Sequence, residues 1–241
     1  MRIPSLPPFE RTALLLDLDG TLLDIAPAPD KVVVPSGLPG SLRTLRDQLD
    51  GALAVVTGRP VETVDALLGD APYAVAGEHG GAIRHAPGED LERPSLPAPP
   101  EAWLDEAARL AAAHPGVILE RKVRGFGFHF RATPEAGPAL HDALCEMLAD
   151  STSFQLLAGL MLWEVRPLGV DKGSAVAALQ ARSPFTDRLQ VFVGDDVTDE
   201  DGIKVARAMG GIGLWVPDIF GDAAGVRAWL KAAASAGSWP A

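Results

Sequence analysis

Runs of consecutive apolar residues alternate along much of the 241-residue chain with segments of helical periodicity. The apolar runs are typical of strands buried on both faces of a parallel sheet, and they cover residues 12–18, 52–57, 73–76, 189–193 and 212–216. The segments with helical spacing are 38–49, 61–68, 172–181, 199–209 and 223–234. Strands and helices that alternate in this way predict a doubly wound parallel α/β domain.

The middle of the chain follows a different pattern. A proline-rich loop leads into predicted helices and strand pairs in the order 101–113 (helix), 117–122 and 126–131 (strands), 134–148 (helix), 154–157 and 161–165 (strands). Helix, hairpin, helix, hairpin is an α+β arrangement. The pattern therefore predicts a core of residues 1–83 and 167–241 with an inserted module at residues 84–166.

The composition is that of a globular protein, with 47% hydrophobic and 22% charged residues. Acidic residues outnumber basic ones by 32 to 21, and the net charge of -11 argues against nucleic acid or an anionic membrane as a partner. No apolar run is long enough for a membrane span, and the first residues do not resemble a signal peptide. We therefore expect a cytoplasmic protein, most simply a monomer.

Cys145 is the single cysteine, so the chain cannot form an internal disulfide. Its neighbours Leu144, Met147 and Leu148 suggest an apolar helix face. We therefore expect Cys145 to be a buried core thiol and not a nucleophile.

Two clusters of acidic residues follow apolar runs of the predicted sheet. Asp17 and Asp19 close the run 12–18, and residues two apart in an extended chain point the same way. Five acids fall within residues 195–201, directly after the run 189–193. The helix dipole favours one or two acids in a first turn but does not require five. Both clusters together predict a shared divalent cation, and oxygen ligands favour Mg²⁺. A solvated turn remains the alternative for Asp17 and Asp19 alone.

Two further polar features suit a phosphoryl group. Thr57, Gly58 and Arg59 stand at the end of the second apolar run, and Lys172 opens the helix after the inserted module. A hydroxyl, a backbone amide and a lysine in one pocket would bind phosphate and offset crowded carboxylates. Taken singly, each signal is weak, because a Thr-Gly at a strand end is usually part of a turn and a single lysine such as Lys172 is usually a surface residue.

In this order and spacing, the four features resemble the haloacid dehalogenase superfamily of Mg²⁺-dependent phosphatases. The superfamily signature of acid-x-acid-Gly-Thr, Thr or Ser, Lys, and Gly-Asp-Asp-x-x-Asp is matched by residues 17–21, Thr57, Lys172 and 194–199. The resemblance spans residues 12–234 and implies a haloacid dehalogenase-like core.

The resemblance implies a catalytic role for each matching residue. Asp17 would be the nucleophile that forms an aspartyl-phosphate, and Asp19 would be the general acid and base. Thr57 and Lys172 would hold the phosphate, with Gly58 and Arg59 beside them in the substrate site. An acid at Asp19 also argues against dehalogenase chemistry, which does not need this acid/base group.

The same resemblance implies a set of Mg²⁺ ligands. They are the Asp17 carboxylate, the main-chain carbonyl of Asp19 and the Asp195 carboxylate. Asp196 or Asp199 would support the ion directly or through water, and the resemblance leaves the choice between them open.

The position of the insertion narrows the class further. The stretch between Asp17 and Thr57 is too short for a cap domain beside a strand–helix unit, whereas the stretch between Thr57 and Lys172 has ample room. This is the second (C2) cap type, which in the superfamily accompanies sugar-phosphate phosphatases. Phosphomutases usually carry a cap between the first two motifs, where this chain has no room.

Several stretches resemble one family within this superfamily, the trehalose-6-phosphate phosphatases. These stretches are residues 76–80, 119–122, 129–131, 164–167 and 194–200. The resemblance implies a sugar phosphate as substrate and a functional link to a trehalose-6-phosphate synthase. It also implies substrate contacts from Glu78, His79, Glu120, Lys122, His129, Arg131 and Glu164. Polar side chains suit a sugar, because hydrogen bonds to hydroxyls discriminate better than apolar contacts.

A purely structural role is also open for some of these residues. Glu120 and Lys122 alternate as residues on a solvent-exposed strand face do, and His79 and His129 could be structural histidines. The chain also departs from the family at Leu160, where the family commonly has a lysine that reaches the substrate.

Two alternative functions follow. One is a phosphatase for another sugar phosphate, of the sucrose-, mannosylglycerate- or glucosylglycerol-phosphate type. The other is a sugar-phosphate-binding protein without catalytic activity, which the complete set of acids at Asp17, Asp19 and Asp195 makes the weaker hypothesis.

Overall fold

The computed structural model describes residues 3–28 and 31–240, which divide into two compact units. The core comprises Met1–Pro94 and Val170–Ala241, and the cap comprises Ser95–Gly169. The core continues beyond residue 83, the boundary expected from the sequence. Strand β4 (Ala82–Arg84) pairs with the core sheet, and a bridge between Ile83 and Glu92 ties the next segment to it.

The core is built on one sheet with the strand order β10-β9-β1-β2-β3-β4. Its strands are β1 (Thr12–Leu16), β2 (Leu53–Val56), β3 (Ala74–Gly77), β4, β9 (Leu189–Gly194) and β10 (Ile212–Trp215). All neighbours pair in parallel except β3 and β4. Every residue of β1, β2 and β3 is buried, as expected for apolar strands covered on both faces. The predicted doubly wound parallel sheet is confirmed.

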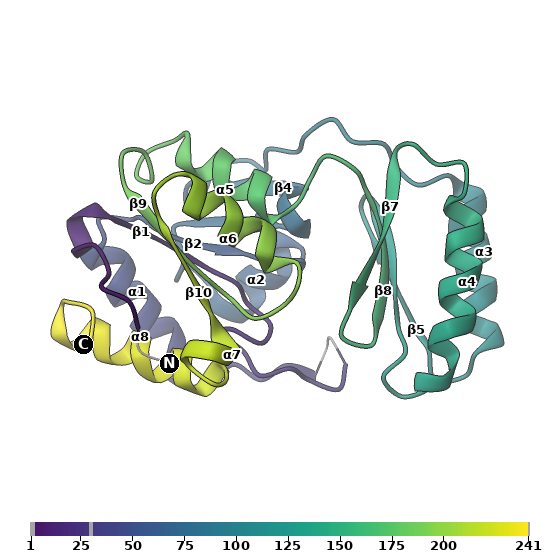
Figure 1. Ribbon diagram of the computed structural model, residues 1–241, viewed down its shortest axis with the longest axis horizontal. Helices are drawn as coiled ribbons and strands as arrows, with labels where there is room; N and C mark the ends of the chain where they lie inside the picture. Colours follow the sequence, from purple (N-terminus) through teal and green to yellow (C-terminus); the bar gives the residue numbers. More distant parts are fainter. Residues whose placement is uncertain (1–2, 29–30, 241) are drawn as a thin grey trace. The chain divides into compact units, whose positions relative to one another are not determined.

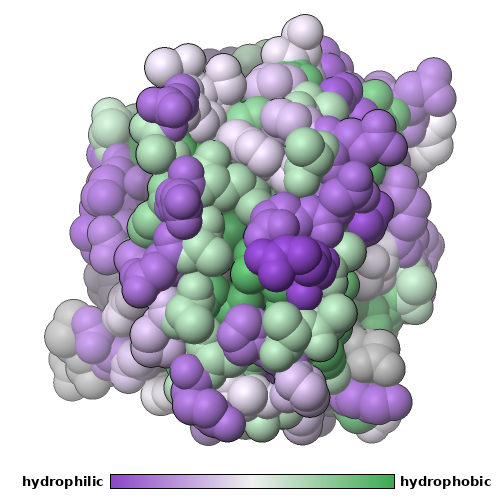
Figure 2. Space-filling view, turned by 90° about the vertical axis from the view of Figure 1, so that its right-hand side faces the viewer, coloured by the Kyte–Doolittle hydropathy of each residue, from purple (hydrophilic) through white to green (hydrophobic). Residues whose placement is uncertain are grey.

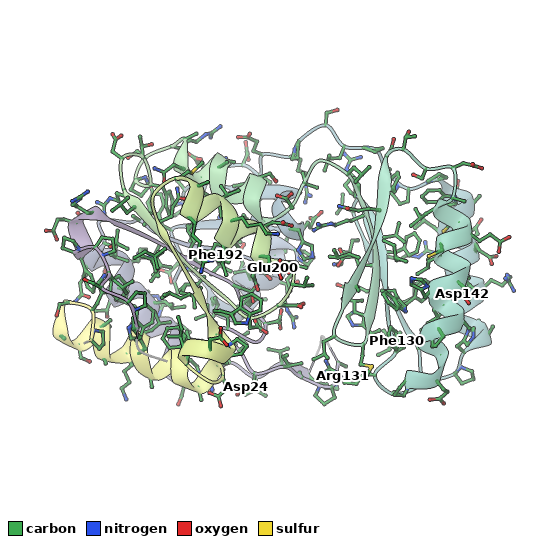
Figure 3. All side chains as sticks on the ribbon, in the orientation of Figure 1. Asp24, Phe130, Arg131, Asp142, Phe192 and Glu200 are labelled. Atoms are coloured by element: carbon green, nitrogen blue, oxygen red, sulfur yellow. The ribbon has the colours of Figure 1, made fainter. Side chains whose placement is uncertain are left out.

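Helices cover the two faces of this sheet. They are α1 (Leu38–Gln48), α2 (Val61–Leu68), α5 (Lys172–Gln180), α6 (Asp199–Ala208), the short α7 (Val216–Ile219) and α8 (Ala223–Ala236), with short 3-10 turns at Phe9–Arg11 and Glu78–Gly80. In Figure 1, α1 and α8 lie together on one face, and α5 and α6 lie on the other. Figure 3 shows Phe192 of β9 inside this core and Glu200 at the exposed start of α6. Among the residues described, no helix combines the length and apolarity that crossing a membrane requires.

The cap is an antiparallel sheet backed by two helices. Its elements are α3 (Glu101–Ala113), β5 (Ile118–Lys122), β6 (Gly125–His129), a 3-10 turn (Pro134–Ala136), α4 (Gly137–Leu148), β7 (Phe154–Gly159) and β8 (Leu162–Pro167). The strand order is β5-β6-β8-β7. The predicted α+β insertion is therefore confirmed. The surface over α3 and α4, which faces the viewer in Figure 2, mixes hydrophilic and apolar side chains.

The two faces of the cap sheet differ in chemistry. Phe126, Phe128 and Val165 are buried on the face that packs against the helices. Side chains alternate along a strand, and Glu120 and Glu164 both lie opposite Gly127 in the register. Both glutamates therefore stand on the other face, which carries charged residues.

The expectation of a buried Cys145 is wrong, because this residue is exposed. The buried face of α4 contains Gly137, Leu140 and Leu144, spaced by three and four residues. Cys145 is one residue further along, about 100° around the helix, and points away from the core. Figure 3 shows Asp142 pointing outward from the same helix, whereas Phe130 lies inside the cap.

Candidate active site

Three parallel strands of the core end beside one another, and each is followed by a polar residue. Asp17 follows β1, Thr57 follows β2 and Asp195 follows β9. The register pairs Leu16 with both Val55 and Val193, so the three strand ends are level. Ligand sites of open parallel sheets lie at this carboxyl edge.

Lys172 brings a positive charge to this edge. It is the first residue of α5, whose start is fixed by a capping box between Asp171 and Ser174. The Lys172 ammonium donates to Asp17 Oδ1 and to Asp199 Oδ1, both at 2.6 Å. All three side chains are at least 95% buried. Lys172 is therefore a buried partner of two carboxylates, and the surface-lysine alternative is excluded.

Asp199 uses both of its carboxylate oxygens. Oδ1 accepts the hydrogen bond from Lys172, and Oδ2 accepts the backbone N–H groups of Asp195 and Asp196, each at 3.0 Å. Asp199 thus holds the loop that carries Asp195, while Asp196 Oδ1 accepts from the backbone N–H of Val197.

Negative charge exceeds positive charge in this cluster. Carboxylate oxygens of Asp17, Asp195 and Asp199 lie within 4.8 Å of one another. Burial, reinforced by the charge of Asp199, raises the pKa of Asp17 well above its usual value, although Lys172 opposes the shift. Burial also raises the pKa of Asp195 to about 6. Burial opposes protonation of Lys172, but the charges of Asp17 and Asp199 raise its pKa. Three carboxylates thus share one ammonium group, and an oxygen-only donor set suits a hard divalent cation.

Residues of the first acidic motif hold Asp195 in place. Thr21 Oγ1 donates to Asp195 Oδ1 at 3.0 Å. Gly20 has a positive φ of 89°, and a Cβ at this position would collide with the Asp195 carboxylate. A glycine is therefore required here both by the backbone conformation and by the close approach of Asp195.

The carboxylate of Asp19 is engaged by an arginine of the second motif. Arg59 donates from Nε to Asp19 Oδ2 at 2.6 Å and from Nη2 to Asp19 Oδ1 at 2.7 Å. This two-point geometry is the strong form of an arginine–carboxylate pair. The Asp19 carboxylate is not part of the cluster of Asp17, Asp195 and Asp199.

A strained turn follows β3 next to the Thr57 loop. Glu78 and His79 both adopt left-handed backbone conformations, with φ of 54° and 55°, which cost on the order of 1–3 kcal/mol each for residues other than glycine. Their backbone N–H groups donate to Arg59 O and Thr57 O, at 3.0 and 2.9 Å. The Glu78 carboxylate accepts from Arg93 Nη1 at 2.8 Å.

The charged face of the cap sheet contains one ion pair and one hydrogen bond between a histidine and a carboxylate. Lys122 Nζ lies 2.8 Å from Glu164 Oε1, and their side chains are 9% and 5% exposed. His129 Nε2 lies 2.8 Å from Glu120 Oε2. Burial opposes ionisation of Glu120, but its hydrogen bond with His129 lowers its pKa. Neither Lys122 nor Glu164 belongs to a solvated strand face.

Two other cap residues lie at strand ends. Arg131 comes just after β6 and is labelled in Figure 3. Leu160, where the resemblance implies a lysine, is 60% exposed in the turn between β7 and β8. An exposed leucine cannot replace the charged hydrogen bonds of a lysine.

The structure thus brings Asp17, Asp195, Asp199, Lys172 and Thr57 to one edge of the core sheet. Glu120, Lys122, His129 and Glu164 share the charged face of the cap. Sequence reasoning missed Thr21 as a partner of Asp195, although it belongs to the first motif. It also missed Arg93, because the sequence pattern places residues 84–94 in the inserted module.

Comparisons with known proteins agree with this architecture. The family model for trehalose-phosphatase matches residues 15–218. The chain is 37% identical over 207 residues to a probable trehalose-phosphate phosphatase of Sinorhizobium fredii, covering 86% of this chain and 78% of the relative. It is 36% identical over 205 residues to the trehalose-6-phosphate phosphatase of Escherichia coli, covering 84% and 76%.

A solved structure shows the same fold. The C-terminal domain of the C. albicans trehalose-6-phosphate phosphatase superposes with a TM-score of 0.72 at 24% sequence identity, covering 83% of this chain and 74% of that one. The fold is that of a haloacid dehalogenase-like hydrolase with an inserted cap. Because the family model covers most of its length, the chain belongs to the trehalose-phosphatase family and is a phosphatase.

The buried charge cluster makes Lys172 essential for stability. We expect Lys172→Met to lower the free energy of unfolding by about 3–5 kcal/mol in chelator, because Asp17 and Asp199 then remain buried without a cation. Lys204→Met is the matched control, since Lys204 is exposed and pairs with Glu200 at the surface. This change should lower the free energy of unfolding by less than about 1 kcal/mol. Urea unfolding followed by circular dichroism measures the free energy of unfolding of both variants. Equal losses in the two variants would contradict this view of the cluster.

Proposed function

We propose that this phosphatase hydrolyses trehalose 6-phosphate to trehalose and inorganic phosphate through an aspartyl-phosphate on Asp17. The observation that carries the proposal is the position of Asp17 at the end of β1, bonded to Lys172 and within 4.8 Å of Asp195 and Asp199. Family membership supports the choice of substrate. A reaction that transfers a sugar onto a sugar phosphate must supply this substrate, which implies a functional link to a trehalose-6-phosphate synthase.

The residues present fit a Mg²⁺ ion. Asp17, the main-chain carbonyl of Asp19 and Asp195 would hold it. Asp199 would not bind the ion directly, because both of its oxygens already accept hydrogen bonds. It would instead hold Lys172 and the backbone of Asp195 in position. When bound, the ion would supply positive charge that offsets the carboxylates and the incoming phosphate.

Asp17 has the position expected of a nucleophile. Its carboxylate would attack phosphorus, and the bond between phosphorus and the sugar oxygen would break. Lys172 and the Thr57 hydroxyl would stabilise the negative charge on the phosphoryl oxygens. Water would then attack phosphorus and release phosphate, which restores the Asp17 carboxylate.

Asp19 would transfer the protons of both steps. It would donate a proton to the departing sugar oxygen and then accept one from the attacking water. In the present structure Arg59 binds both oxygens of Asp19. Each Asp19 oxygen accepts one N–H from Arg59 and keeps a further lone pair that can accept a proton, so the pair would orient the acid/base group.

The charged face of the cap sheet would supply sugar specificity. Glu120, Lys122 and Glu164 are grouped on this face, and Arg131 follows the neighbouring strand. Carboxylates and an ammonium can accept and donate hydrogen bonds to sugar hydroxyls. Each such charged hydrogen bond contributes on the order of 1.5–3 kcal/mol, which is enough to separate one disaccharide phosphate from another.

Asp17→Asn tests the covalent step. We expect this variant to fold but to lose activity by roughly 10³-fold or more, because an amide cannot form the intermediate. Asp19→Asn should slow hydrolysis of the sugar phosphate far more than the first step with p-nitrophenyl phosphate, whose leaving group needs no proton. Stopped-flow release of p-nitrophenol and steady-state phosphate release measure the two effects. Near-normal turnover by Asp17→Asn would rule out the mechanism.

The substrate is tested by phosphate release from a panel of disaccharide and related sugar phosphates. We expect trehalose 6-phosphate to be hydrolysed with the highest kcat/KM. A strong preference for a sucrose-, mannosylglycerate- or glucosylglycerol-type phosphate would overturn the substrate and leave the phosphatase assignment intact. Leu160→Lys should raise kcat/KM for trehalose 6-phosphate more than for the other sugar phosphates, because a lysine at this position would restore charged hydrogen bonds to the sugar.

Lys122→Ala tests the role of the cap. We expect kcat/KM for trehalose 6-phosphate to fall by roughly ten- to a hundredfold, while hydrolysis of p-nitrophenyl phosphate changes little, because that substrate has no sugar. Arg121→Ala is the control, since Arg121 is the adjacent cation on the opposite face of β5. Equal slowing of both substrates by Lys122→Ala would contradict specificity from the cap.

A further inference from the structure

The strained turn at Glu78 and His79 is connected to the loop of the second motif. The Glu78 N–H donates to Arg59 O, and the His79 N–H donates to Thr57 O. The backbone of Thr57 and Arg59, from which the proposed phosphate contact extends, is therefore fixed by these two hydrogen bonds. Since both donors have left-handed conformations, the turn keeps this shape only if its surroundings hold it.

The same turn also contacts the start of α5. Gly80 has a φ of 99°, and a Cβ there would lie 3.0 Å from the carbonyl oxygen of Asp171 and 3.3 Å from Cβ of Ala175. Asp171 is the N-cap of α5, and Lys172 is its first residue. The turn thus lies between the backbone segments that carry Thr57 and Lys172, the two residues proposed to hold phosphate.

Arg93 neutralises the buried acid of this turn. The Glu78 side chain is only 6% exposed, so its carboxylate needs a compensating charge, and Arg93 Nη1 lies 2.8 Å away. Arg93 is itself anchored to the core by its neighbour Glu92. The backbone of Glu92 makes two hydrogen bonds of 2.8 Å with Ile83, and its carboxylate lies 2.6 Å from Arg182.

We propose that Arg93 is a positioning residue for phosphate binding, acting through Glu78 on the backbone of Thr57 and on the start of α5. The pair holds the strained turn against both segments, so that the Thr57 hydroxyl and the Lys172 ammonium reach the same phosphate. Glu78 on this view supports the pocket and does not contact the sugar. The proposal rests on the proposed phosphate site but not on the identity of the sugar.

Arg93→Ala tests this proposal with inorganic phosphate as the probe. Calorimetric titration of phosphate in the presence of Mg²⁺ measures the affinity directly, and the KM for p-nitrophenyl phosphate gives a second measure. Arg84→Ala is the matched control, because Arg84 makes a two-point pair with Asp65, a residue of α2 outside the turn, at 2.7 Å. The unfolding temperatures of both variants show how much each substitution destabilises the fold.

We expect Arg93→Ala to weaken phosphate binding by about tenfold and to raise KM correspondingly, since a misplaced pocket loses its fit. Arg84→Ala should stay within about twofold of the wild type. Arg93→Lys should restore much of the phosphate affinity. The double variant Arg93→Ala/Glu78→Gln should bind phosphate no more weakly than the weaker-binding of the two single variants, because both changes break the same pair.

Unchanged phosphate affinity in Arg93→Ala, or equal weakening in Arg93→Ala and Arg84→Ala, would overturn the proposal. If Arg93→Ala does not fold, Glu78→Gln gives the same test, because it removes the charge and keeps the shape. A wild type that binds phosphate but does not hydrolyse trehalose 6-phosphate would contradict the proposed substrate alone, and the comparison of phosphate affinities would still decide the role of Arg93.

Discussion

The structure of the site depends on placing several carboxylates and one ammonium at the buried edge of a parallel sheet. Asp17, Asp195 and Asp199 crowd together, and Lys172 compensates only part of their charge. Burial, reinforced by the charge of Asp199, raises the pKa of Asp17 well above its usual value and that of Asp195 to about 6. A site with excess negative charge stabilises a divalent cation, and through that cation it can accept a phosphate.

Much of the fold and of the core site could be predicted because their causes are local in the sequence. Apolar runs specify buried strands, and helices α2 (Val61–Leu68) and α3 (Glu101–Ala113) begin and end where their periodicity predicts. Acids that directly follow buried strands have few purely structural roles. For the same reason the sequence could predict that Asp17 and Asp195 lie close together, whereas the place of Lys172 beside them followed only from the family resemblance.

Features that depend on tertiary pairing could not be predicted in this way. The pairs Asp19–Arg59 and Glu78–Arg93 join residues from separate segments of the chain, and nothing in their local pattern indicates the partner. Strand β4 is too short to show a clear alternation of apolar and polar residues. The sequence pattern therefore places residues 84–94, which follow this strand, in the cap. The pattern also misplaces Cys145, because neighbouring apolar residues on a helix do not share one face.

The dependence of thermal stability on Mg²⁺ tests the charge cluster most directly. If the carboxylates bind the ion in the native state only, millimolar Mg²⁺ should raise the unfolding temperature of the wild type above its value in chelator, by the amount that mass action requires. A sodium salt at equal ionic strength controls for screening. Asp195→Asn should lose most of the Mg²⁺-dependent increase. An unfolding temperature that is the same in Mg²⁺ and in chelator would contradict a cation site formed by Asp17 and Asp195.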